Sequence, residues 1–244
     1  MIRITIVNIT FFLVMIVVNY SAATNVGIVA NEEPLLIQPA GYAFSIWGLI
    51  YVLLFLWILR APFQRHDKAG IYRDTQVWIP VNFLLNSVWI ITFTNEYILL
   101  STFIIFLLLF SLIRIYQIIY WKYNEASFAR LPFSIYIGWV SAASVVNLFT
   151  WFVWEDRFPF LRMGELGWTI LALLVLVVAA IICTRVNRDI WYSIVFIWVY
   201  TAIFVKNEDP AILWFTVVAI LLLGINLLLQ GIFLGNERRR KGMQ

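Results

Sequence analysis

Residues 97–119 read YILLSTFIIFLLLFSLIRIYQII, and the only charged side chain in this run is that of Arg114. A helix needs about 20 mainly apolar residues to cross the hydrocarbon core of a bilayer, and this run is long enough to do so. Its apolar residues are continuous, whereas a membrane β-strand alternates apolar and polar residues over about 10 positions. The run is therefore typical of a transmembrane helix, and Arg114 lies close enough to its end to extend toward the lipid headgroups.

Seven further windows share this character, which predicts eight spans at residues 5–24, 43–60, 77–94, 97–119, 132–153, 167–184, 189–205 and 211–234. The chain of 244 residues is 63% hydrophobic and 12% charged. A soluble domain averages about 45–50% apolar and about 25% charged residues. The predicted fold class is therefore an all-α membrane protein, a polytopic helical bundle of about eight transmembrane helices. The composition excludes a soluble enzyme, and the lipid bilayer rather than nucleic acid is the expected partner.

The basic residues predict an orientation for this bundle. Fourteen of the 17 fall in segments on the same side of the predicted spans as the N-terminus. Such an excess marks the cytoplasmic side, so we expect a multi-pass plasma-membrane protein with both termini in the cytoplasm. The basic tail 238–241 is expected to anchor this topology near anionic lipid.

The first segment has two interpretations. Arg3, the apolar run after it and the small residues Ser21-Ala22-Ala23 also fit a cleaved signal peptide. Cleavage would leave seven spans with the same orientation for the rest of the chain. We favour a retained first helix.

Few residues in the predicted spans are suited to acid–base chemistry. We find no carboxylate pair, Ser/His/Asp set, metal cluster or phosphate-binding loop, and the single cysteine, Cys183, excludes a disulfide framework. No catalytic residue, metal site or required cofactor is therefore predicted. The spans contain neutral amides instead: Asn82 and Asn86 share one helical face, as do Asn226 and Gln230. An amide in hydrocarbon needs a partner, so these faces are expected to point toward other helices.

Tryptophan is abundant, with 12 residues. Those near predicted span ends are expected in the interfacial aromatic belt: Trp57, Trp78, Trp121, Trp154, Trp168 and Trp191. Trp47, Trp89 and Trp139 lie inside spans or beside Gly, Pro or Asn. If they point inward beside amides and small residues, they form an apolar pocket for a large planar ligand. Plain helix packing is the alternative.

Three motifs along the chain carry a family resemblance. The first is Pro39-Ala40-Gly41-Tyr42-Ala43-Phe44, followed by Trp47 and Tyr51, at the start of the second span. The second is Leu85-Asn86-Ser87-Val88-Trp89 with Phe93, and the third is Trp139, Ala143, Asn147 and Trp151. Their order resembles the TspO/translocator-protein family of tryptophan-rich sensory membrane proteins (peripheral benzodiazepine receptor-like). The matching helix numbers favour retention of the first helix.

The resemblance covers residues 1–155, a five-helix membrane region, and leaves residues 156–244 as a three-helix extension with a basic tail. It implies a binding site for a tetrapyrrole, such as a porphyrin or haem-type ligand, or for a sterol. It also implies light-dependent porphyrin breakdown, so enzymatic activity stays open. The implied ligand-binding residues are Pro39, Gly41, Tyr42, Phe44, Trp47, Tyr51, Asn86, Trp89, Phe93, Trp139, Ala143 and Asn147.

The sequence departs from the family in its first loop and in the spacing of Phe44 and Trp47, which is one residue shorter. Tyr42 also stands where the family has tryptophan. The favoured function is binding or sensing of a flat hydrophobic small molecule. A transporter or exporter of such a molecule and a regulatory subunit are the alternatives, and assembly into a homodimer is left open.

Overall fold

A computed structural model describes residues 1–32, 35–64, 69–123 and 128–241. For residues 23–28, 30–32 and 236–241 it describes the backbone only. The described residues form helices and turns, with one isolated bridge between Phe160 and Met163. Each of the eight predicted spans falls on a helix. The protein is therefore an all-α, polytopic membrane protein, as the sequence predicts.

Most of the predicted spans lie on helical segments long and apolar enough to cross a bilayer. There are six such segments among the described residues: Ile2–Ala22, Gly41–Phe63, Ile98–Lys122, Leu131–Trp154, Glu165–Val186 and Pro210–Gly235. Two helices are apolar but shorter, Trp78–Thr94 and Trp191–Lys206. The side chains of the basic tail 238–241 are not described, so its predicted role as an anchor lies outside the described part of the chain.

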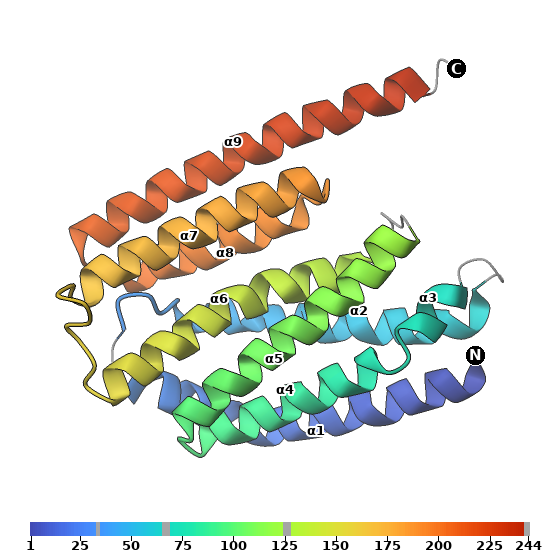
Figure 1. Ribbon diagram of the computed structural model, residues 1–244, viewed down its shortest axis with the longest axis horizontal. Helices are drawn as coiled ribbons and strands as arrows, with labels where there is room; N and C mark the ends of the chain where they lie inside the picture. Colours follow the sequence, from blue (N-terminus) through green and yellow to red (C-terminus); the bar gives the residue numbers. More distant parts are fainter. Residues whose placement is uncertain (33–34, 65–68, 124–127, 242–244) are drawn as a thin grey trace. The chain divides into compact units, whose positions relative to one another are not determined.

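The chain folds into two compact units, the first of which contains residues 1–35 and 44–157. Its α-helices are α1 (Ile2–Glu32), α2 (Ile46–Arg60), α3 (Ala69–Asp74), α4 (Trp78–Thr94), α5 (Ile98–Gln117) and α6 (Leu131–Trp154). Around this unit, α1 packs against α4, α4 against α5, α5 against α6, α6 against α2, and α2 against α1 (Figure 1). These five long helices therefore close into a ring with a shared interior.

Short helical elements connect the long helices of this unit. The predicted loop at about 61–76 contains α3 and the 3₁₀ turn η2 (Ala61–Phe63), while a second 3₁₀ turn, η1 (Gly41–Ser45), precedes α2. A π-helical turn, η3 (Ile118–Lys122), extends α5. Helix α1 continues to Glu32, beyond the expected end near residue 24, because no proline interrupts the chain before Pro34.

The second unit contains residues 36–43 and 158–244. Its helices α7 (Glu165–Val186), α8 (Trp191–Lys206) and α9 (Pro210–Lys241) each contact the other two. The segment 36–43 is held to this unit by the backbone N–H of Ala40, which donates to the Ala202 carbonyl at 3.0 Å. The indole N–H of Trp198 also donates to the Ala43 carbonyl, at 3.1 Å.

The predicted inward-facing amide Asn226 connects all three helices of this unit. Its Oδ1 accepts a hydrogen bond from Nε of Arg185 on α7 at 2.7 Å, and its Nδ2 donates to Ser193 Oγ on α8 at 3.1 Å. Ser193 in turn shares a hydrogen bond with Thr184 at 2.9 Å. Because each buried amide atom has a partner, burying Asn226 in the bundle is compatible with stability.

Trp57 corrects one prediction. Its position near the end of a span suggested an interfacial belt residue, but its side chain is fully buried. The ring lies 4.4 Å from that of Tyr72 on α3 and 5.2 Å from that of Phe133 on α6, and its indole N–H donates to the Ala129 carbonyl at 3.0 Å. The short helix α3 provides part of this cover. Trp57 is therefore a core residue, and the belt interpretation is wrong for it.

Candidate functional site

Four aromatic rings of the first unit form a stacked series, in which each ring is inclined by about 30° to the next. Trp47 and Tyr51 lie one turn apart on α2, and Trp89 and Phe93 lie one turn apart on α4. Ring centroids are 5.6 Å apart for Tyr51–Trp47, 6.1 Å for Trp47–Trp89 and 5.9 Å for Trp89–Phe93. The corresponding interplanar angles are 28°, 30° and 29°. We call this series, Tyr51–Trp47–Trp89–Phe93, the aromatic ladder.

Helix α6 places two further rings against the ladder, edge to face. Tyr136 lies 5.5 Å from Trp47 at 75°, and Trp139 lies 6.3 Å from Trp47 at 86°. Phe44, just before α2, also packs edge to face with Trp139, at 5.6 Å and 82°. Edge-to-face pairs are favourable because the positive edge of one ring meets the negative face of the other. Trp47 therefore contacts aromatic rings from α2, α4 and α6.

The indole nitrogen of Trp139 is an exception in this cluster. The side chain is only 2% exposed, and its Nε1 has no hydrogen-bond partner among the described residues. Burying an indole N–H without an acceptor costs free energy, and such groups in native structures are uncommon. Trp139 therefore offers an unused donor beside Trp47.

A buried amide joins the ladder to α5. The indole N–H of Trp89 donates to Oδ1 of Asn147 on α6 at 2.9 Å. The Nδ2 of Asn147 donates to Ser101 Oγ at 3.0 Å and to Thr102 Oγ1 at 2.8 Å. Asn147 thus fixes the orientation of the Trp89 ring through bonds to both neighbouring helices.

A second amide pair joins the site to α1. Asn86 donates from Nδ2 to the Tyr136 hydroxyl at 2.8 Å, and its Oδ1 accepts from Nδ2 of Asn19 at 2.7 Å. Asn82, one turn before Asn86, donates to Ser111 Oγ at 2.8 Å. These bonds confirm that the amide face of α4 points toward other helices. All five helices of the ring therefore contribute side chains to one polar and aromatic interior.

The structure brings together most of the residues that the sequence suggested. Phe44, Trp47, Tyr51, Asn86, Trp89, Phe93, Trp139 and Asn147 are linked by the ring contacts and by hydrogen bonds to shared partners. Ala143 is half-buried on α6, one turn from both Trp139 and Asn147. Pro39, Gly41 and Tyr42 belong to the second unit, where the Tyr42 ring lies 5.3 Å from that of Trp198.

Four residues of this interior were not predicted from the sequence as site residues: Asn19, Ser101, Thr102 and Tyr136. A signal for Asn19 was present, because it is an amide in a mainly apolar predicted span and is therefore expected to seek a partner. Ser101 and Thr102 carried a weaker signal, since a helical hydroxyl can bond to its own backbone. Tyr136 gave none beyond its place in a span.

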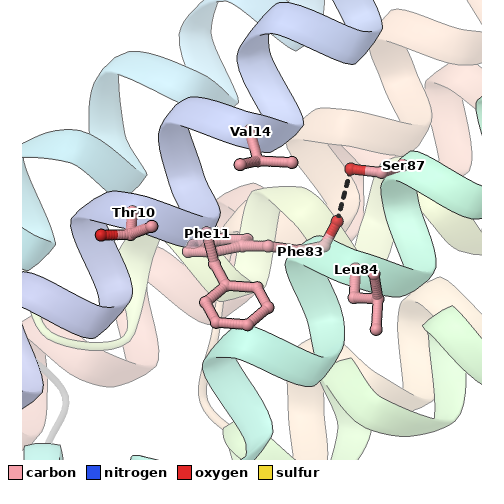
Figure 2. Close-up of a pocket in the computed structure, with 6 residues that line it drawn as sticks. All are labelled: Thr10, Phe11, Val14, Phe83, Leu84 and Ser87. Atoms are coloured by element: carbon pink, nitrogen blue, oxygen red, sulfur yellow. Dashed lines mark hydrogen bonds between the residues drawn. The ribbon is translucent and has the colours of Figure 1, made fainter.

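A small cavity lies elsewhere in the first unit, between α1 and α4 (Figure 2). It measures about 90 Å³ and is lined by Thr10, Phe11, Val14, Phe83, Leu84 and Ser87. The Ser87 hydroxyl already donates to the Phe83 carbonyl at 3.0 Å. Ligand pockets for drug-sized molecules occupy about 300–1,000 Å³, so this cavity is too small for a tetrapyrrole.

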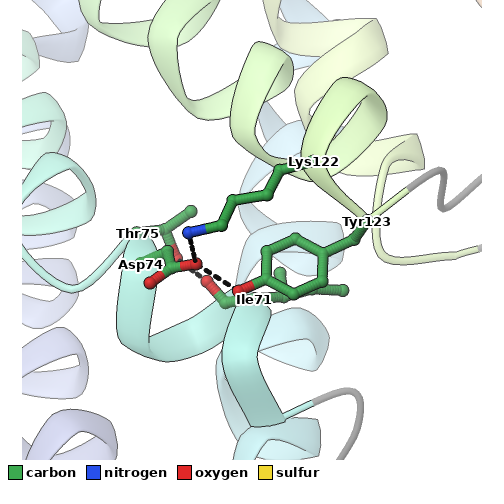
Figure 3. Close-up of polar contacts among 5 residues, drawn as sticks. All are labelled: Ile71, Asp74, Thr75, Lys122 and Tyr123. Atoms are coloured by element: carbon green, nitrogen blue, oxygen red, sulfur yellow. Dashed lines mark hydrogen bonds and ion pairs between the residues drawn. The ribbon is translucent and has the colours of Figure 1, made fainter.

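A polar cluster holds α3 to the end of η3 (Figure 3). Oδ2 of Asp74 lies 2.6 Å from Nζ of Lys122 and also accepts a hydrogen bond from the Tyr123 hydroxyl. The hydrogen bond with Lys122, followed by that with Tyr123, lowers the pKa of Asp74 below its ordinary 3.8. Burial, together with the bond to Asp74, raises the pKa of Tyr123 to about 12. These shifts suit a structural clamp rather than a proton donor at neutral pH.

The fold and interior define the class to which the protein belongs, a polytopic helical membrane protein with a tryptophan- and asparagine-lined interior. The sequence matches the TSPO-like protein family over residues 5–229, and the chain belongs to this family. The matched range includes α7, α8 and much of α9, and so extends past the five-helix region to which the three motifs are confined. No curated protein and no solved structure matches the chain.

Proposed function

We propose that this protein binds a flat, hydrophobic small molecule of the tetrapyrrole class and serves as a sensory or binding protein of the plasma membrane. The proposed position of the ligand is between the rings of Trp47 and Trp89. The observation that carries the proposal is the geometry of this pair, whose rings are 30° from parallel with centroids 6.1 Å apart. The two rings must move apart to admit a planar ring, which would then exchange one aromatic pair for two, each of which favours an offset, nearly parallel arrangement.

The surroundings of this pair support a planar ligand. Tyr51 and Phe93 continue the ladder on either side, so a ligand between Trp47 and Trp89 keeps aromatic support behind both faces. Trp139 Nε1, which has no hydrogen-bond partner among the described residues, lies on a ring that already contacts Trp47. It can donate to an acceptor at the edge of the ligand, which removes the cost of leaving it unpaired.

A tetrapyrrole fits this chemistry better than a sterol. A tetrapyrrole presents a π-surface that stacks on indole. A sterol presents aliphatic faces, which gain little from the stacked arrangement of the rings. The contacts in the ladder come from neutral side chains, so they recognise the flat ring system of the ligand and not its charged substituents. The proposal therefore concerns recognition of the ring and assigns no chemical step.

Quenching of tryptophan emission by protoporphyrin IX tests the proposal on the purified full chain. The double variant Trp47→Phe/Trp139→Phe should bind about 10-fold more weakly, because it shrinks the stacking surface at Trp47 and removes the Trp139 N–H donor, a combined loss of about 1.4 kcal/mol. Trp214→Phe is the matched control, since Trp214 on α9 is 73% exposed. A sterol that displaces protoporphyrin IX with equal affinity would overturn the ligand class. Equal affinity of the double variant and the control would overturn the site.

A further inference from the structure

A groove at one end of α5 and α6 is separate from the aromatic ladder. It is an open groove with a volume of about 450 Å³. Its lining comes from the turn between α4 and α5, the first turns of α5 and the last turn of α6. The residues that define its chemistry are Glu96, Tyr97, Phe103, Trp151, Trp154 and Glu155.

The lining combines aromatic rings with negative charge. Tyr97 and Phe103 are 65% and 64% exposed, and Trp154 is 36% exposed, so none of the three rings is fully covered by the rest of the chain. Glu96 and Glu155 are exposed carboxylates, and the lining contains no basic residue. Aromatic faces attract cations, and carboxylates add direct attraction. The two carboxylates repel an anion, and they offer a neutral molecule no charge–charge attraction. The lining therefore favours a cation.

A cationic side chain of the protein, that of Arg157, already contacts two residues of this lining, Glu155 and Trp151. A guanidinium nitrogen of Arg157 lies 3.4 Å from Oε2 of Glu155, and its central carbon lies 5.8 Å from the centroid of the Trp151 ring. The side chains of Arg157 and Glu155 are 55% and 46% exposed. Exposed pairs of this kind contribute little to stability, so an external cation with an apolar tail can displace Arg157.

We propose that this groove binds an amphipathic cation, an aliphatic chain that carries an ammonium or quaternary ammonium group. The cationic group lies at Trp151, Glu96 and Glu155, where it replaces Arg157. The aliphatic chain lies along Phe103 and the apolar start of α5. The distribution of basic residues predicts that this end faces away from the cytoplasm. The proposal is independent of the tetrapyrrole site, because no residue of the aromatic ladder lines the groove.

Equilibrium binding of radiolabelled decyltrimethylammonium to the full chain in uncharged maltoside micelles tests this assignment, with empty micelles subtracted. Decyl sulfate and decanol, which have the same chain length, are the comparison ligands. We expect the cation to bind about 10-fold more tightly than either, and Glu96→Gln/Glu155→Gln to remove that preference. Glu208→Gln, at an exposed glutamate outside the groove, is the matched control and should keep it.

Arg157→Ala should raise the affinity for decyltrimethylammonium, whereas a misfolded variant would lower it. Removal of the built-in competitor should tighten binding of decyltrimethylammonium about 3-fold, whereas Arg162→Ala should leave it unchanged. Equal binding of the three ligands, an unchanged affinity in the double glutamine variant, or weaker binding by Arg157→Ala would each overturn the proposal. Protoporphyrin IX quenching by the same variants should match that of the unmodified protein, which keeps the two proposals separable.

Discussion

The indole N–H of Trp89 donates to Oδ1 of Asn147 at 2.9 Å, and this bond joins α4 to α6 across the interior of the first unit. Both side chains are buried, with exposures of 5% and 2%. Their pairing links two of the motifs that lie far apart in the sequence. It also sets the plane of the Trp89 ring, on which the proposed ligand would stack.

Replacement of Asn147 by Leu tests the cost of losing this bond. Ser101 and Thr102 keep their hydroxyl bonds to the Ile98 carbonyl, both at 2.8 Å, so the main loss is the acceptor for Trp89. A buried donor left unpaired costs about 1–3 kcal/mol. We expect the free energy of unfolding in micelles to fall by this amount. Asn95→Leu, at an exposed amide, is the control, and an equal loss in both variants would contradict the assignment.

The same substitution at two tryptophans should have unequal effects. Trp89→Phe removes a donor that is paired with Asn147, whereas Trp139→Phe removes a donor that has no partner among the described residues. Both variants leave a similar space. We expect Trp89→Phe to destabilise the protein by about 1 kcal/mol more than Trp139→Phe, as measured by unfolding midpoints. The reverse order would show that Trp139 Nε1 has a stabilising partner.

The sign of the pH dependence at Asp74 follows from its lowered pKa. A carboxyl group with a lower pKa in the folded protein stabilises the fold above its ordinary pKa, and this contribution disappears as the pH falls through the lowered value. The largest cause of the lowered pKa is the hydrogen bond with Lys122. We expect Asp74→Asn to lower the free energy of unfolding at neutral pH by no more than about 1 kcal/mol. The measured sign is a lower unfolding temperature. A gap between the two proteins that stays constant in acid would contradict this expectation.

Gly70 gives a second test of the same clamp. A Cβ atom on Gly70 would lie 2.6 Å from the Tyr123 hydroxyl oxygen and 2.9 Å from Cε1, so the tyrosine ring must move in Gly70→Ala. Movement breaks its hydrogen bond to Asp74 and exposes the ring. The pKa of Tyr123 should then fall from about 12 toward its ordinary 10.0.

Alkaline difference spectra of each protein against its Tyr123→Phe counterpart measure this pKa. The raised pKa stabilises the fold below the ordinary value, and this stability is lost as the pH rises toward 12. Gly224→Ala is the control, because nothing lies within 4 Å of a Cβ there. An unchanged Tyr123 titration in Gly70→Ala would show that the ring does not depend on the glycine.

The sequence predicted the helices well because long apolar runs have few alternatives in a bilayer. It also predicted that the amides of α4 face other helices, since an unpaired amide in hydrocarbon is costly. It did not distinguish Trp57 in the core from a belt residue, because proximity to a span end is common to both. The cover over Trp57 comes partly from α3, a short helix within a predicted loop.

Much of the site could be assembled from motifs, but its internal pairing could not. The spacing of Trp47 and Tyr51, and of Trp89 and Phe93, predicts rings on one face of each helix. Which helices then meet depends on packing between distant segments, so the partners Asn19 and Tyr136 were missed. The contiguity of Pro39, Gly41 and Tyr42 with Phe44 similarly gave no sign that the chain passes from one compact unit to the other at this point.

A structure of the full chain with protoporphyrin IX bound tests the central claim most directly. The account predicts that the macrocycle lies between Trp47 and Trp89, with those rings moved apart and still nearly parallel to it. Trp139 Nε1 should donate a hydrogen bond to the edge of the ligand. A bound macrocycle elsewhere, with the Trp47 and Trp89 centroids still about 6.1 Å apart, would contradict the claim.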